Sequence, residues 1–427
     1  MTTGAVGTPD TAKLRREAWT PPPRQEWVAR FNAEADNLDA HEIVPLNLES
    51  LIASASANTG LSDFGDDLWR PHFEFICGAL EDEADLSFIG RIAARAHLLN
   101  VLEGRLRIED AYRRHPEIDD EPIREPIFII GNGRSGTSML QNLLAEDPAN
   151  GYLATWEAMY PVPFDEQTDD ADERIAKADR LIRLWERIVP ESTAVHEFTG
   201  TVPAECVQIQ SYFGLSRWFA LLGQIGSYTQ YMATADWVPS YRYHKRVLKL
   251  LQWYRPRQRW LLKAPSHIMR LPVLFAEYPD ASLLWPHRDP VQAVASFTNL
   301  AGTWNWISSD HPRVASWEHL TDPRAAARML EAPIAWLESG QIPADRIVNV
   351  LYNDLVEDPL GTVESIYRHY GWPSGERGRT AIARYLTQHP RSTRPTHTYA
   401  KGTGEIIEHE RRVFARYTDY FNVPPEV

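Results

Sequence analysis

The chain has 427 residues, of which 43% are hydrophobic and 24% charged, as in a globular protein with one large domain and an accessory unit. Its net charge of −14 argues against nucleic-acid binding, so an anionic ligand would require a local cationic pocket. Cys77 and Cys206 are too few for a disulfide framework or an all-cysteine zinc site, and no metal is expected. No signal peptide or transmembrane segment is recognisable, so we predict a cytoplasmic protein.

The first third of the chain is predicted to be helical after a flexible tail. Residues 1–25 are polar and include three consecutive prolines, which is typical of a tail. Residues 26–120 form a helical N-terminal region, in which 86–112 has the clearest apolar face. An acidic linker that begins at Asp119 then leads into residues 121–427, which we predict to be one P-loop-like domain.

The most informative stretch is PIFIIGNGRSGTSMLQNLLAEDP, residues 126–148. Its apolar run 127–130 predicts a strand that is buried on both faces. Three glycines at 131, 133 and 136 allow a tight turn, and 137–146 has a helical pattern. A strand, a glycine-rich loop and a helix N-terminus together form a cradle of backbone N–H groups for an anion. The stretch therefore predicts a phosphate-binding loop.

This loop differs from the Walker A motif of nucleoside triphosphatases. Gly131 and Gly136 have the Walker A spacing, and Ser138 takes the Ser/Thr position. Thr137 replaces the lysine that contacts the γ-phosphate, and the cationic residue is Arg134, three positions earlier. We therefore expect a phosphorylated ligand other than a nucleoside triphosphate.

Strands and helices alternate through the rest of the domain. Helices are predicted at 171–189 and 241–253, and strand–helix pairs at 258–263 with 267 onward, 281–287 with 290–299, and 346–352 with 359–370. The fold class is therefore α/β, with a P-loop-type parallel sheet flanked by helices, a helical N-terminal region and a helical C-terminal extension. Ligands would bind at the carboxyl ends of the strands. The aromatic-rich segment 199–240 either lines a substrate cleft or forms part of the core.

A second anion-binding element is predicted near residue 288. The strand 281–287 is followed by Arg288, Asp289 and Pro290, and the next helix carries Ser296. Arg288 and Ser296 could converge on one phosphate at the end of the strand. The same Arg-Asp-Pro sequence also occurs as an ordinary start of a helix.

Together these motifs resemble the sulfotransferases that use 3′-phosphoadenosine 5′-phosphosulfate (PAPS), in particular their bacterial branch. The matching segments are PIFIIGNGRSGTSML, RWLLKAPSH, EYPDASLLWPHRDPVQAVAS and VLYNDLVEDPLGTVESIY, in family order across 126–370. Of the C-terminal Arg-Lys-Gly motif of the cytosolic branch, this sequence matches only the Lys-Gly pair, at Lys401 and Gly402.

The resemblance implies a role for each matching residue. Arg288 and Ser296 would bind the 3′-phosphate, Tyr352 would approach the adenine, and Lys263 would contact the bridging oxygen and the transferring group. The 5′-phosphosulfate would lie against the glycine-rich loop, at Gly133, Arg134, Ser135, Gly136, Thr137 and Ser138.

Sulfuryl transfer to a hydroxyl requires a base, cations that offset charge on the transferring oxygens, and an in-line arrangement of the reacting groups. The catalytic candidates are Arg134 and Lys263 as cations and either Glu157 or His267 as the base. Glu157 occupies the position of a catalytic glutamate in the bacterial and tyrosylprotein branches. His267 is two residues from the histidine of the cytosolic branch. Glu205 and His196 remain further alternatives for the base.

We therefore predict an enzyme that transfers a sulfuryl group from PAPS to the hydroxyl of a small molecule. The aromatic residues of 199–254 favour a lipophilic or ring-bearing acceptor. A P-loop kinase and a catalytically silent nucleotide-binding protein are the two alternatives.

Overall fold

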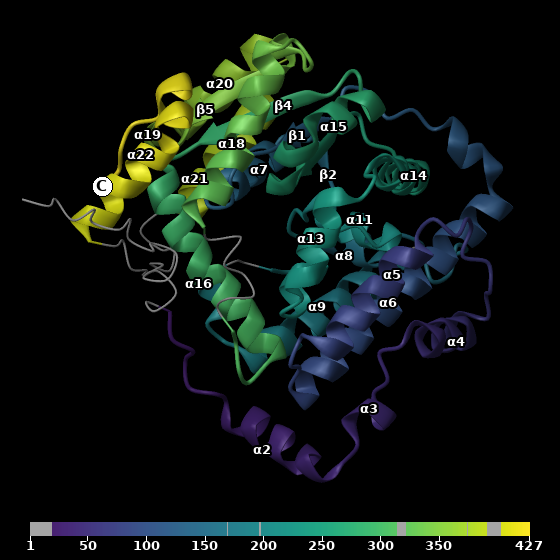
Figure 1. Ribbon diagram of the computed structural model, residues 1–427. Helices are drawn as coiled ribbons and strands as arrows, with labels where there is room; N and C mark the ends of the chain where they lie inside the picture. Colours follow the sequence, from purple (N-terminus) through teal and green to yellow (C-terminus); the bar gives the residue numbers. More distant parts are fainter. Residues whose placement is uncertain (1–18, 169, 196–197, 314–321, 374, 391–402) are drawn as a thin grey trace, which may run out of the picture.

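The fold is built on a five-stranded parallel sheet, which lies in the upper half of the molecule in Figure 1. The computed structural model describes residues 19–168, 170–195, 198–313, 322–373, 375–390 and 403–427. The strand order is β2-β3-β1-β4-β5, and every pairing is parallel. The strands are β1 (Ile127–Ile129), β2 (Gly151–Tyr152), β3 (Trp260–Lys263), β4 (Ser282–His287) and β5 (Ile347–Leu351). The predicted parallel sheet flanked by helices is thus confirmed, with β1 in its middle.

Alternate residues of β1 enter two different hydrophobic clusters, one on each face of the sheet. Ile127 and Ile129 belong to the smaller cluster, while Phe128 and Ile130 belong to the larger one. This period-two alternation is expected of a strand that is buried on both faces. The smaller cluster includes residues of α7 (Thr137–Ala145), α20 (Pro359–Tyr370) and α21 (Glu376–Gln388).

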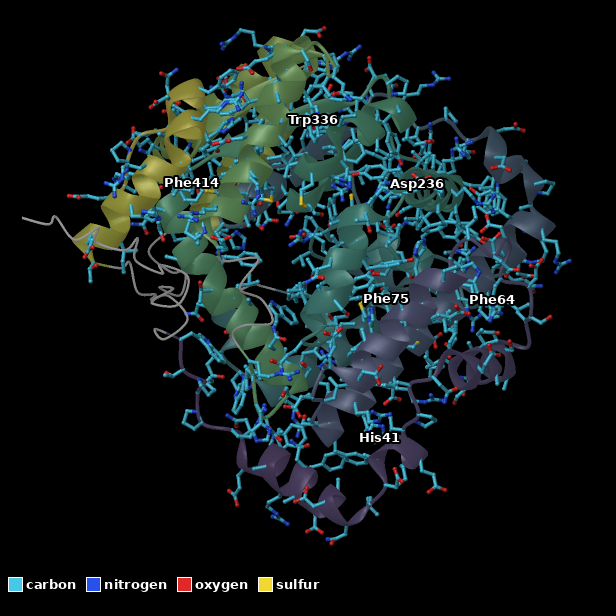
Figure 2. All side chains as sticks on the ribbon, viewed as in Figure 1. His41, Phe64, Phe75, Asp236, Trp336 and Phe414 are labelled. Atoms are coloured by element: carbon cyan, nitrogen blue, oxygen red, sulfur yellow. The ribbon has the colours of Figure 1, made fainter. Side chains whose placement is uncertain are left out.

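The larger cluster extends from the other face of the sheet into the N-terminal helical region. That region consists of α2 (Glu26–Glu34), α3 (Ala40–Ile43), α4 (Leu48–Thr59), α5 (Arg70–Asp82) and α6 (Phe88–Arg114). Phe75 of α5, labelled in Figure 2, stacks on Tyr231 of α13 (Gly226–Thr234), and the ring centroids are 4.4 Å apart. The helical region therefore shares its core with the rest of the chain.

A buried cation also joins the N-terminal region to the helices beside the sheet. Arg105 of α6 is 1% exposed and donates hydrogen bonds to the carbonyls of Phe64 and Tyr212. Its guanidinium lies 4.4 Å from the ring centroid of Tyr243. Next to it, Gly104 lets α6 approach closely, because a Cβ there would lie 2.4 Å from the ring of Tyr212.

The segment between the sheet's second and third strands contains α8 (Thr155–Met159), α9 (Ala171–Ile188), α10 (Ser192–Val195), α11 (Cys206–Gln210), α12 (Phe219–Leu222), α13 and α14 (Val238–Tyr254). Figure 1 shows these helices in teal beside the purple and blue N-terminal helices. The predicted helices 171–189 and 241–253 are confirmed as α9 and α14. The helix predicted from 267 begins as a 3₁₀ turn, η4 (Pro265–Arg270), and continues as α15 (Leu271–Glu277), with Pro272 in its first turn.

The C-terminal part supplies α16 (Pro290–Ser308), α18 (Pro323–Glu338), α19 (Tyr352–Glu357) and α22 (Gly404–Phe421). In α22, Phe414 (labelled in Figure 2) is fully buried. At the other terminus, Trp19 packs against Gly302 of α16, and Arg24 donates a hydrogen bond to the Ser309 carbonyl. Residues 1–18 of the predicted tail lie outside the described residues. Among the described residues, no helix is both long and apolar enough to cross a bilayer.

His97, whose ring Nε2 is buried, is expected to make the fold sensitive to acid. Burial lowers the pKa of His97 to about 4, whereas an unfolded histidine has a pKa of about 6.5. Below pH 6.5 the unfolded chain therefore binds a proton that the folded chain does not, and stability is lost as pH falls toward 4. We expect His97 to reduce the free energy of unfolding by about 2 kcal/mol between pH 7 and pH 5. Urea unfolding of wild type and His97→Leu at both pH values tests this, because the free energy of unfolding of the variant should fall by about 2 kcal/mol less than that of wild type. An equal fall in the two proteins would contradict the lowered pKa of His97.

Candidate active site

The glycine-rich loop connects the end of β1 to the start of α7. Gly136 has a left-handed backbone (φ +96°), and a Cβ there would lie 2.9 Å from the ring of Tyr352. Only glycine satisfies both conditions without strain. Gly136 is also the N-cap of α7, so no side chain caps the first N–H groups of that helix. These N–H groups and the positive end of the helix dipole are therefore available to an anion.

Two polar side chains of the loop are held by neighbours. Ser135 is buried and donates a hydrogen bond to the Asn132 carbonyl at 2.7 Å. Arg134, whose φ of +71° is left-handed, donates from Nε to Ser296 Oγ at 3.0 Å. The structure thus brings Ser296 of the predicted 3′-phosphate element directly to the predicted phosphosulfate loop.

Lys263 lies at the carboxyl end of β3, beside the loop. Its side chain is 1% exposed, and Nζ lies 3.2 Å from Ser138 Oγ and 2.6 Å from Glu205 Oε1. Glu205 immediately precedes α11, and its side chain is 26% exposed. An ammonium, a loop hydroxyl and an accessible carboxylate therefore converge at one point.

That point opens into a cavity of about 350 Å³. Its polar end contains loop residues 131–134, together with Thr137, Ser138 and Glu205. The remainder is largely apolar and includes Phe198, Trp218, Leu221, Met269, Phe297, Leu300, Trp304 and Met329. The aromatic segment 199–240 contributes both to the cavity wall and to the core, because Trp218 lines the cavity while Tyr212 and Tyr228 are buried in the core.

The structure places Glu157 outside this cavity lining. Glu157 is 2% exposed and is the third residue of α8. One carboxylate oxygen accepts the Ala154 N–H at 3.1 Å, and the other pairs with Arg257. Both oxygens are therefore occupied in capping a helix and in an ion pair.

His267 also lies behind the cavity wall, although its neighbours Pro265 and Ser266 line it. The ring is 1% exposed, and its Nδ1 is 2.7 Å from the Tyr241 hydroxyl. Burial lowers the pKa of His267 to about 3. His196, the remaining histidine candidate, lies outside the described residues.

Arg288 follows β4 and stands beside the loop, where its Nη1 donates to the Arg134 carbonyl at 3.2 Å. Its guanidinium also makes two 2.8 Å hydrogen bonds to the Glu426 carboxylate and lies 4.3 Å from the centroid of the Tyr352 ring. Arg288, Ser296 and Tyr352 therefore all lie against the same loop, and the side-chain carboxylate of Glu426 contacts Arg288 there.

Two residues of this region were not predicted from the sequence. Arg217 lines the cavity, and its Nη1 lies 3.5 Å from Met269 Sδ. Burial and the nearby Arg270 lower the pKa of Arg217 to about 10. Glu426 lies 138 positions beyond the arginine that it contacts. Only folding brings either residue to the site, so no local motif could have identified them.

Comparison with known proteins gives one consistent result. The family model described as the sulfotransferase family matches residues 126–376. The crystal structure of sulfotransferase STF1 from Mycobacterium tuberculosis H37Rv superposes with a TM-score of 0.72 and 30% identity, over 87% of this chain and 98% of that one. STF9 from Mycobacterium avium has the same fold, with a TM-score of 0.74 and 24% identity over 92% and 99% of the two chains.

Among curated proteins, the chain is similar to omega-hydroxy-beta-dihydromenaquinone-9 sulfotransferase Stf3 of Mycobacterium tuberculosis (strain CDC 1551 / Oshkosh) and Mycobacterium bovis. Identity is 24% over 287 residues, which cover 62% of this chain and 67% of the relative. The family match covers more than half of the chain and includes the whole glycine-rich loop, Lys263 and Arg288. The protein therefore belongs to the sulfotransferase family.

Proposed function

We propose that the protein transfers the sulfuryl group of PAPS to the hydroxyl of a lipophilic small molecule. The observation that carries the proposal is the position of Lys263 Nζ, between Ser138 of the anion-binding loop and Glu205. This arrangement joins a phosphate-binding loop to an acid–base pair at the mouth of a largely apolar cavity. A nucleotide sulfuryl donor and an apolar alcohol would meet at that point.

The loop residues fit the anionic end of PAPS. The uncapped N–H groups of α7 and the side chains of Arg134, Thr137 and Ser138 would bind the 5′-phosphosulfate. Arg288 and Ser296 would bind the 3′-phosphate, and Tyr352, which covers Gly136, would contact the adenine. This distribution of donors would let a chain whose net charge is −14 bind a nucleotide with two separate anionic groups, the 3′-phosphate and the 5′-phosphosulfate.

Glu205 is our choice for the base, because its carboxylate lines the cavity next to Lys263. The acceptor oxygen attacks sulfur as Glu205 takes the hydroxyl proton, and the bond between sulfur and the bridging oxygen of the phosphate breaks. The leaving nucleotide keeps that electron pair, and Lys263 and Arg134 offset the charge that develops there. In this scheme Glu157 supports α8 and His267 supports the wall, and neither needs to enter the cavity.

The acceptor class follows from the lining of the cavity. Aromatic, aliphatic and thioether side chains together form most of its wall, which favours an acceptor with a substantial apolar body. The Stf3 relatives are named for a menaquinone derivative that carries a terminal hydroxyl. We therefore expect long-chain or isoprenoid alcohols to be better acceptors than sugars.

Incubation with PAPS and a panel of isoprenoid, aliphatic, phenolic and sugar alcohols tests this proposal. Release of 3′-phosphoadenosine 5′-phosphate together with a sulfated isoprenoid or aliphatic product is the expected result. Nucleotide binding without transfer to any alcohol would support the silent nucleotide-binding alternative. Phosphorylation of an acceptor from ATP and Mg²⁺ would support the kinase.

The contact between Arg288 and Glu426 gives a prediction about affinity. Arg288→Ala removes a charge-assisted contact and should weaken binding of 3′-phosphoadenosine 5′-phosphate by about 2 kcal/mol. Glu426→Gln should instead tighten it, because a carboxylate no longer competes with the phosphate for Arg288. Calorimetry with 3′-phosphoadenosine 5′-phosphate and with ADP measures both effects. Equal changes for the two nucleotides would show that Arg288 does not bind the 3′-phosphate.

A further inference from the structure

A buried cluster of three potential metal ligands lies outside the residues that our mechanism uses. Cys206 of α11, His244 of α14 and His267 of η4 each offer one ligand atom, and the three atoms all lie within 4.8 Å of one another. All three residues are at most 1% exposed. They stand 38 and 23 positions apart in the sequence, so no metal-binding motif marks them.

In both histidines Nδ1 lies within hydrogen-bond distance of a tyrosine hydroxyl, which leaves Nε2 available to bind a metal ion. His244 Nδ1 is 2.7 Å from the Tyr278 hydroxyl, and His267 Nδ1 is 2.7 Å from the Tyr241 hydroxyl. Both Nε2 atoms are buried and have no hydrogen-bond partner among the described residues. Histidines that bind metals commonly donate their second N–H to such a neighbour, which fixes the ring and leaves the other nitrogen for the metal.

The third group is the thiol of Cys206, which is fully buried. A cysteine binds a metal ion as the thiolate, so a bound metal would displace the thiol proton.

The geometry requires only small movements on metal binding. Three atoms within 4.8 Å of one another form, at most, an equilateral triangle with sides of 4.8 Å. The centre of that triangle lies about 2.8 Å from each atom, which is the side length divided by √3. Typical bonds are about 2.3 Å from zinc to sulfur and 2.0–2.1 Å from zinc to nitrogen. Each ligand atom would therefore move by less than about 1 Å.

We propose that Cys206, His244 and His267 form a buried binding site for a thiophilic transition-metal ion of the zinc type. One thiolate and two imidazoles suit Zn²⁺ and exclude Mg²⁺ and Ca²⁺, which require oxygen ligands. The ion would connect α11, α14 and η4 behind the cavity wall. Because Glu205 precedes Cys206 and Ser266 precedes His267, the site would fix the backbone that carries the base and part of the wall.

Metal binding to the full, tag-free chain tests the proposal. After removal of metal with a chelator, the protein is dialysed against Zn²⁺ or Co²⁺, and the retained metal is measured by mass spectrometry. We expect about one equivalent of either ion, and a thiolate-to-cobalt charge-transfer band with Co²⁺. Zn²⁺ should also raise the melting temperature, whereas Mg²⁺ should leave it unchanged.

Cysteine variants assign the ligand. Cys206→Ala and Cys206→Ser should each lose the charge-transfer band and the thermal shift. Cys77→Ala is the matched control, because Cys77 is the other buried cysteine and lies in α5, outside the cluster; it should keep both signals. The wild-type measurement stands even if a Cys206 variant does not fold. Less than about 0.1 equivalent retained by wild type, or an unchanged band in a folded Cys206 variant, would overturn the proposal.

Discussion

Lys263→Met is expected to lower turnover by about 10³-fold while the protein remains folded. The ammonium of Lys263 lies beside the loop that would bind the phosphosulfate, and its burial strengthens electrostatic stabilisation of the leaving group. Methionine keeps the length of the side chain and removes only the charge. The measurement is kcat at saturating PAPS and acceptor, with circular dichroism as the check on folding.

Lys245→Met is the matched control, because Lys245 also pairs with a glutamate, Glu277, at 3.3 Å, whereas Lys263 pairs with Glu205 and also contacts Ser138 of the glycine-rich loop. Its turnover should remain within about twofold of wild type. Equal losses in the two variants, or wild-type turnover in Lys263→Met, would remove Lys263 from the catalytic step.

Glu205→Gln is expected to slow turnover by about 10²-fold or more with little change in nucleotide affinity. Glutamine keeps the shape of the side chain but cannot accept the hydroxyl proton of the acceptor at neutral pH. The loss should therefore appear in kcat, while calorimetric binding of 3′-phosphoadenosine 5′-phosphate stays near the wild-type value.

Glu157→Gln separates the two carboxylate candidates for the base. Our scheme predicts lower stability for this variant, because the buried ion pair with Arg257 is lost, with turnover of the folded fraction largely retained. The opposite outcome, a large kcat loss in Glu157→Gln and an active Glu205→Gln, would transfer the role of base to Glu157.

Local sequence patterns predicted the elements that depend on local chemistry. The apolar run 127–130 and the glycines after it led to β1 and its loop, because burial on both faces and a tight turn each leave a clear signal. Helix ends agree within a few residues at α9 and α20. The helix predicted at 290–299 in fact continues to Ser308 as α16, because its later residues, including Trp304 and Ile307, are buried.

Long-range contacts could not be predicted in the same way. Lys263 was identified from its motif, but its pairing with Glu205 joins positions 58 apart. The Glu157 carboxylate has a suitable position in the sequence, and only the structure shows that Ala154 and Arg257 occupy it. The cluster of Cys206, His244 and His267 likewise exists only because α11, α14 and η4 meet behind the cavity.

Calorimetric binding of 3′-phosphoadenosine 5′-phosphate, compared with ADP and ATP in the absence and presence of Mg²⁺, tests the central claim most directly. The arrangement of Arg134, Ser296 and Arg288 around the loop predicts a strong preference for the 3′-phosphorylated nucleotide without Mg²⁺. A preference for ATP that appears only with Mg²⁺ would contradict the proposed use of PAPS.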